Sequence, residues 1–186
     1  MDIIKKLAQE LAIKEEQAKA AVQLIDEGNT IPFIARYRKE MTGALNDETL
    51  RNLHERLLYL RNLEEKKEQV INAITDQGKM TEDLKKKILS AETLVAVDDL
   101  YRPYRPKKQT RATKAKEKGL EPLANILLLQ KTTKSMEEEA AAFVNAEKGV
   151  ANAKEAIAGA KDIIAEMIAD MADYRKSIRN CTMKQG

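Results

Sequence analysis

Leucines recur at intervals of three and four residues in the first half of the chain, and this spacing constrains the fold more than any other feature of the sequence. The stripe is made of Leu50, Leu53, Leu57, Leu60 and Leu63, and it is extended by Val70, Ile71 and Ile74. Residues at this spacing share one face of an α-helix, which turns once every 3.6 residues. Asn46, followed by two acidic residues, is typical of a helix start. The pattern predicts one helix of about 30 residues, roughly 45 Å long.

The remaining sequence has the same periodicity. Only seven glycines and four prolines interrupt the 186 residues, and shorter helices are predicted between them. Their expected starts are Asp2, Thr30, Thr81, Pro122, Ser135 and Asn152, which have the residue types that favour a first helical turn. Residues 94–97 are apolar and partly β-branched, so a strand is the alternative there, but no similar run exists to pair with it. The sequence therefore predicts an all-α, multi-helix fold.

Composition excludes several classes of protein. With 43% hydrophobic and 34% charged residues, the chain can bury a core and is not wholly disordered. One histidine, His54, and one cysteine, Cys181, exclude a Cys/His metal cluster and a Cys-His nucleophile pair. Asp98 and Asp99 would point about 100° apart on a helix, which favours a role as helix-end charges over acid and base catalysis. No phosphate-binding glycine loop is present, so we expect no enzyme activity, no cofactor and no metal.

The sequence also bears on cellular location. The longest apolar run is the five residues 140–144, and the N-terminal residues contain no continuous apolar stretch like that of a secretory signal. A single cysteine fits a reducing compartment. A cytoplasmic protein without membrane contact is therefore expected.

Charge is unevenly distributed along the chain. The formal net charge is +3, but residues 101–118 hold eight Lys or Arg and one acidic residue, so this segment is +7 and the remainder is −4. Two tyrosines and two prolines interrupt the basic residues, and single-strand binders combine such cations with stacking rings. The candidate phosphate contacts are Arg105, Lys107, Lys108 and Arg111, and the candidate stacking or packing groups are Tyr101 and Tyr104. The alternatives are an acidic protein surface as ligand, or a basic loop that pairs with the acidic remainder of the chain.

Residues 29–40 form a second notable stretch. Pro32 suits a first helical turn, and Phe33 and Tyr37 share one helix face at a spacing of four. We expect this face to pack in the core, with Arg36 and Arg38 solvated. The two arginines are secondary candidates for nucleic-acid contact.

Several long stretches resemble one known family. They are residues 29–40 with 42–43, 100–107 with 110–112, 117–124, and 156–166. Together they are similar, in order, to the N-terminal region of the bacterial Tex proteins, which are transcription accessory factors. The family usually has leucine at the position of Arg102 and arginine at that of Gln109, so neither residue is assigned a contact.

The resemblance implies an all-helical region, residues 1–186, with a helix-turn-helix-like portion. It further implies a fragment of a longer multidomain protein in which an RNase H-like domain, helix-hairpin-helix elements and an OB-fold RNA-binding domain follow. The expected function is non-catalytic: a helical module that contributes to RNA or DNA binding near the transcription machinery, weakly in this fragment. The alternative is a scaffolding region that binds RNA polymerase or other domains and no nucleic acid. Self-association is expected if Ile164, Ile168 and Met171 are covered by other parts of the parent protein.

Overall fold

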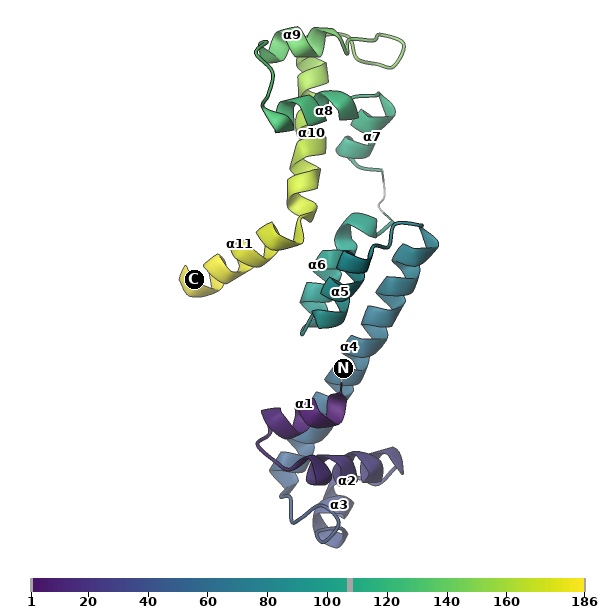
Figure 1. Cartoon of the computed structure of the whole chain (residues 1–186), viewed down its shortest axis with the longest axis vertical. Helices are drawn as coiled ribbons and strands as arrows, with labels where there is room; N and C mark the ends of the chain where they lie inside the picture. Colours follow the sequence, from purple (N-terminus) through teal and green to yellow (C-terminus); the bar gives the residue numbers. More distant parts are fainter. Residues whose placement is uncertain (1, 107–108, 186) are drawn as a thin grey trace. The chain divides into compact units, whose positions relative to one another are not determined.

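The computed structural model describes residues 2–106 and 109–185, and this part of the chain is built from α-helices (Figure 1). The helices are α1 (Ile3–Glu10), α2 (Glu15–Asp26), α3 (Ile31–Tyr37), α4 (Asp47–Asp76), α5 (Glu82–Ser90), α6 (Leu94–Tyr101), α7 (Arg111–Glu117), α8 (Glu121–Leu129), α9 (Met136–Ala141), α10 (Ala153–Asp170) and α11 (Ala172–Gln185), with a 3₁₀ turn η1 (Arg102–Tyr104) after α6. The only β pairing among the described residues is an isolated bridge between Asn145 and Val150. The all-α prediction is confirmed, including the helix over residues 94–97, whereas the helix-turn-helix portion stays a prediction.

The chain divides into two compact units, Met1–Val97 and Asp98–Gly186, and the boundary falls within α6. In the first unit, α4 is the predicted leucine helix and is 30 residues long. It begins where the sequence indicates, because the Asn46 side chain accepts a hydrogen bond from the Thr49 amide at 2.7 Å. Acidic residues in its first turn, Asp47 and Glu48, complement the helix dipole.

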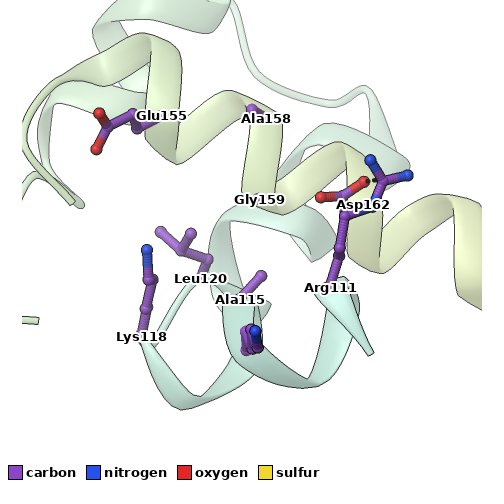
Figure 2. A pocket seen from close by; sticks show the side chains of 9 residues that line it. Arg111, Ala115, Lys118, Leu120, Glu155, Ala158, Gly159 and Asp162 are labelled. Carbon is purple, nitrogen blue, oxygen red and sulfur yellow. Dashed lines mark ion pairs between the residues drawn. The ribbon is translucent and has the colours of Figure 1, made fainter. Parts of the chain in front are cut away.

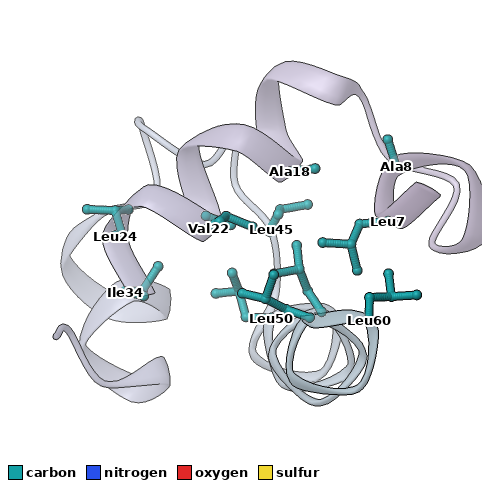
Figure 3. Close-up of a cluster of buried hydrophobic side chains, with 12 residues drawn as sticks. Leu7, Ala8, Ala18, Val22, Leu24, Ile34, Leu45, Leu50 and Leu60 are labelled. Carbon is teal, nitrogen blue, oxygen red and sulfur yellow. The ribbon is translucent and has the colours of Figure 1, made fainter. Parts of the chain in front are cut away.

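The core of the first unit lies between α1, α2, α3 and the first half of α4 (Figure 3). Leu7, Leu24 and Ile34 are fully buried there against the leucines of α4. Each such side chain contributes about 1.5–3 kcal/mol by leaving water. The tight turn between α2 and α3 uses Gly28 at a φ of 85°, a conformation that glycine adopts without strain.

The second half of α4 holds α5 through a buried lysine. Lys67 Nζ donates to Glu64 Oε1 at 2.8 Å and to the Leu89 carbonyl, near the C-terminal end of α5, at 2.9 Å. Both bonds compensate the burial of the ammonium group.

In the second unit, α7, α8 and α9 pack on α10. Asn152 caps α10 through the Glu155 amide, and Ser135, a predicted helix start, forms a capping box with Glu138 at the start of α9. Leu120, Leu123 and several alanines fill the core. Helix α10 ends at Asp170, because Met171 has an extended backbone with a ψ of 117°, and α11 begins directly after it. None of the described helices has the length and apolar character needed to cross a membrane.

Candidate nucleic-acid interface

The basic segment, residues 101–118, contributes helical structure on both sides of residues 107–108. Tyr101 ends α6 and η1 follows it directly, with Pro103 in the 3₁₀ turn. After a short connection, Thr110 caps α7 by accepting a hydrogen bond from the Thr113 amide at 3.0 Å. Lys107 and Lys108 lie outside the described residues, so their phosphate contacts stay a prediction.

Arg105 already has partners within the chain. Its Nη2 donates to Asp98 Oδ1 at 3.0 Å, and its Cζ lies 5.5 Å from the centroid of the Tyr101 ring. Tyr101 and Tyr104 are half-buried. The structure therefore brings Arg105 and Tyr101 together, but as an intramolecular cation–π pair rather than as an open stacking platform.

The residues around this pair are fixed to the α10–α11 corner. Arg102 Nε donates to Asp170 Oδ1 at 3.0 Å, and the Asp170 side chain is only 12% exposed. Asp99 accepts hydrogen bonds from Arg175 at 2.7 Å and Arg179 at 2.6 Å. Asp98 and Asp99 thus have separate arginine partners and do not converge on one site. Arg102, which stands where the family usually has leucine, thus forms an ion pair that is internal to the fold.

Exposed cations of the segment lie along α7 and its C-cap. Arg111, Lys114 and Lys118 lie three and four residues apart and line a shallow pocket of about 250 Å³ between α7 and α10 (Figure 2). Arg111 Nη2 lies 3.5 Å from Asp162 Oδ1, but the Arg111 side chain is 87% exposed. Lys118 Nζ donates to the Gly149 carbonyl at 2.8 Å, whereas Lys114 has no ion pair within the described ranges. Lys114 and Lys118 were not candidates from the sequence, although their helical spacing from Arg111 is the signal that finds them.

The secondary candidates, Arg36 and Arg38, lie in the first unit beside two aromatic rings. Arg38 Cζ is 5.2 Å from the centroid of the Phe33 ring, and Arg36 Cζ is 5.9 Å from that of Tyr37. The expectation that this aromatic face packs in the core is wrong, because Ile34 takes that place and both rings are partly exposed.

An apolar surface crosses the end of α10 and the start of α11. Ile168, Met171, Tyr174 and Ile178 are exposed, and three of them line a groove of about 380 Å³. Ile164, by contrast, packs against the core of the second unit. Self-association through this surface stays a prediction. Across the described part of the chain, no group of His, Cys, Asp and Glu could hold a metal ion.

Comparison with known proteins identifies the family. The family model described as Tex-like protein N-terminal domain matches residues 1–75, and the model described as Tex central region-like matches residues 131–186. Escherichia coli YhgF is 48% identical over 178 residues, which are 96% of this chain and 23% of that protein. The Neisseria gonorrhoeae transcriptional accessory protein Tex is 45% identical over 97% of this chain and 23% of its own length. Human S1 RNA-binding domain-containing protein 1 is 32% identical over 99% of this chain and 18% of its own.

The basic segment falls between the two regions that the family descriptions match. The chain spans about a quarter of the length of its bacterial relatives. The predicted family is thereby confirmed: the chain belongs to the Tex family of transcription accessory proteins and corresponds to the N-terminal region of its members.

Proposed function

We propose that the chain is a non-catalytic helical module of a transcription accessory protein and that it contributes weakly to the binding of RNA or DNA. The observation that supports this role is the row of cations along α7 and its C-cap, where Arg111, Lys114 and Lys118 line a shallow pocket. Three cations on one helix face can follow the phosphates of a single strand. A cytoplasmic location goes with this proposal.

Ion-pair energies distinguish contact residues from structural ones. An exposed pair such as Arg111 with Asp162, or Arg105 with Asp98, contributes only about 0–1 kcal/mol. A phosphate can therefore replace the carboxylate at little cost. The pair between Arg102 and the nearly buried Asp170 is more costly to break, because it would remove a charged partner from a carboxylate that water barely reaches. The proposed phosphate contacts are Arg105, Arg111, Lys114 and Lys118.

The names of relatives fit this role. One is called a transcriptional accessory protein, and the human relative is named for an S1 RNA-binding domain. We extend the transcription-related role and nucleic-acid contact to this chain as part of the proposal.

A salt titration of nucleic-acid affinity tests the role of α7. Fluorescence anisotropy would compare oligo(U), oligo(dT) and duplex DNA at several salt concentrations. About four phosphate contacts on a single strand give a slope of log affinity against log salt near −3, from roughly −0.7 per contact. The Arg111→Gln/Lys114→Gln/Lys118→Gln variant should weaken binding of all sequences alike and flatten that slope by about 2.

The matched control removes the same charge elsewhere in the second unit. Lys131, Lys134 and Lys184 are exposed, and their triple exchange to glutamine should leave the slope nearly unchanged. Equal losses in the two triple variants would show that the effect is overall charge and would refute a specific α7 contact.

The apolar surface on α10 and α11 supports a second candidate function, protein interaction with RNA polymerase or other domains. Exposed Ile168 and Ile178 are typical of a surface that another protein covers. Under this alternative, Ile178→Glu abolishes capture of purified RNA polymerase, and neither triple variant alters nucleic-acid affinity.

A further inference from the structure

Helix α3 exposes two aromatic rings at the surface of the first unit. Tyr37 is 60% exposed and Phe33 is 36% exposed, although the helix has a fully buried residue, Ile34, that fixes it to the core. The ring centroids are 5.2 Å apart and the ring planes are tilted by 46°. The rings therefore contact each other and leave aromatic surface facing solvent.

The same surface holds cations that lack carboxylate partners. Arg36, Arg38 and Lys39 form no ion pair with any residue of the described ranges. Glu40 is the one acidic residue among residues 36–40. This arrangement differs from that around η1, where Arg102 and Arg105 are paired with Asp170 and Asp98. Arg38 Nη1 donates to the Tyr37 carbonyl at 3.5 Å, and the guanidinium groups of Arg36 and Arg38 have no carboxylate partner that would compete with an anion.

Hydrogen bonds hold the backbone beneath this surface in place. Buried Thr42 donates from Oγ1 to the Arg38 carbonyl at 3.3 Å, and Gln17 Nε2 donates to the carbonyls of Thr42 and Gly43 at 3.2 and 3.0 Å. A surface on a fixed backbone loses little conformational freedom when a ligand binds.

We infer that the α3 surface, Phe33, Arg36, Tyr37, Arg38 and Lys39, binds single-stranded nucleic acid by stacking a base on its aromatic rings and pairing phosphates with its cations. The inference rests on the proposed nucleic-acid function and adds a second contact site in the other unit. A carboxylate-rich peptide would use the three cations but leave two rings in water. A single strand supplies both phosphates and flat base faces, so it matches every exposed group.

The guanidinium groups now beside the rings do not prevent stacking. An exposed cation–π contact is weaker than the stacking of a base on an aromatic side chain. A base can therefore displace Arg36 from Tyr37, or stack on the outer face of the guanidinium, and the released donors then reach the adjacent phosphates.

A nucleic-acid strand that lacks bases distinguishes base stacking from phosphate pairing. The 186-residue chain would be titrated with oligo(dT) and with an abasic deoxyribose-phosphate strand of the same length. Tyr37→Leu should weaken binding to oligo(dT) by roughly 5- to 150-fold, the range for loss of one stacked base, and leave the abasic strand unaffected. Tyr37→Phe keeps the ring and should keep the affinity. Arg36→Gln/Arg38→Gln should weaken both strands alike.

The matched control is Tyr174→Leu, the same exchange at a tyrosine that is 50% exposed on α11, and it should change neither affinity. Equal losses on both strands with Tyr37→Leu, or no loss, would overturn the stacking role. So would binding of poly-glutamate that Arg36→Gln/Arg38→Gln abolishes while oligo(dT) affinity is unchanged, since the ligand is then an acidic protein segment.

Failure of this inference is distinguishable from failure of the proposed function. If the α7 triple variant loses its salt slope while Tyr37→Leu binds normally, only the α3 site is wrong. If Tyr37→Leu loses oligo(dT) affinity while the α7 variant binds normally, the α3 site stands and the α7 role fails. Absence of binding to every strand at low salt refutes both.

Discussion

At the scale of single residues, Asp99 shows how one carboxylate fixes a helix. Its side chain is 7% exposed, and its two oxygens accept hydrogen bonds from Arg175 and Arg179 of α11. Burial would by itself raise the pKa of the Asp99 carboxyl, but the hydrogen bonds and charges of the two guanidinium groups outweigh it and hold the pKa below its usual range. The folded state therefore favours the charged carboxylate.

Asp99→Asn should destabilise the second unit because it leaves two guanidinium groups without their carboxylate. Both arginine side chains are about one-third exposed, so water replaces part of the interaction, and the expected loss is about 1–3 kcal/mol. Urea unfolding at neutral pH measures it. The control is Asp173→Asn, an exposed residue on α11, the helix that carries the two arginines, which should change stability by less than about 0.5 kcal/mol. Equal effects of the two variants would contradict the role of Asp99.

The same carboxylate should make stability depend on pH. Because folding lowers its pKa, its contribution is fully present above the unfolded-state pKa of about 3.9 and is lost as the pH falls through the lower, folded-state pKa. The unfolding free energy of the unmodified chain should therefore fall more steeply on acidification than that of Asp99→Asn. Parallel curves for the two proteins would show that Asp99 does not titrate with folding.

At the scale of the elements, Gly159 allows α10 to pack closely on α7 and on Leu120. A methyl group added at Gly159 would overlap Leu120 Cδ1 and lie 3.2 Å from Ala115 Cβ. The atoms nearest to this glycine are therefore side-chain atoms of the packed segment and not its backbone. The close contact belongs to the pairing of α7 with α10 in the core of the second unit.

Gly159→Ala should therefore be destabilising, although alanine favours a helix interior by about 1 kcal/mol over glycine. Overpacking typically costs about 1–3 kcal/mol, which exceeds that gain. Leu120→Val removes the overlapping Cδ atoms, so in that background the same Gly159→Ala exchange should become stabilising by up to about 1 kcal/mol. Denaturant unfolding of the unmodified chain, the two single variants and the double variant measures both effects. If Gly159→Ala changes the unfolding free energy in the same direction with Leu120 and with valine at that position, the steric explanation is disproved.

Helix starts were predictable because their signals are local. The side chains of Asn46, Thr81, Ser135 and Asn152 each accept a hydrogen bond from an amide three residues later, so a few neighbouring residues suffice to recognise the cap. The long α4 was predictable for a similar reason, since its leucine stripe lies within one element. Thr30 occupies the predicted position before α3 but makes no side-chain cap bond.

The candidate site was less predictable because its charges pair across long stretches of sequence. Arg102 and Asp170 are 68 positions apart, and Asp99 and Arg175 are 76 apart. Composition identified a basic segment correctly but could not show which cations have an intramolecular partner. The spacing of Lys114 and Lys118 from Arg111, three and then four residues, could have been read from the sequence. This spacing places the three side chains on one helix face, which composition alone does not show.

At the scale of the whole molecule, buried hydrophobic side chains in residues 2–106 and 109–185 form two separate core clusters. One consists of buried residues between Leu7 and Leu60, and the other of buried residues between Ala112 and Ile163. Each core draws its side chains from a single unit. The sequence predicted one helical region, residues 1–186, because the helical periodicity is the same in both units and does not show which helices share a core.

Separate cores predict that the two units unfold independently. Leu57 and Leu123 are both buried, one in each core, and replacing either with alanine should cost about 2–5 kcal/mol. Hydrogen exchange measured by mass spectrometry should show faster exchange in α1–α4 for Leu57→Ala and in α7–α10 for Leu123→Ala, with the other unit unchanged. The two variants are controls for each other, because they remove the same atoms from different cores. If either variant accelerates exchange in both units, the chain unfolds as one cooperative body, and binding at the α3 surface would then depend on the stability of the second core.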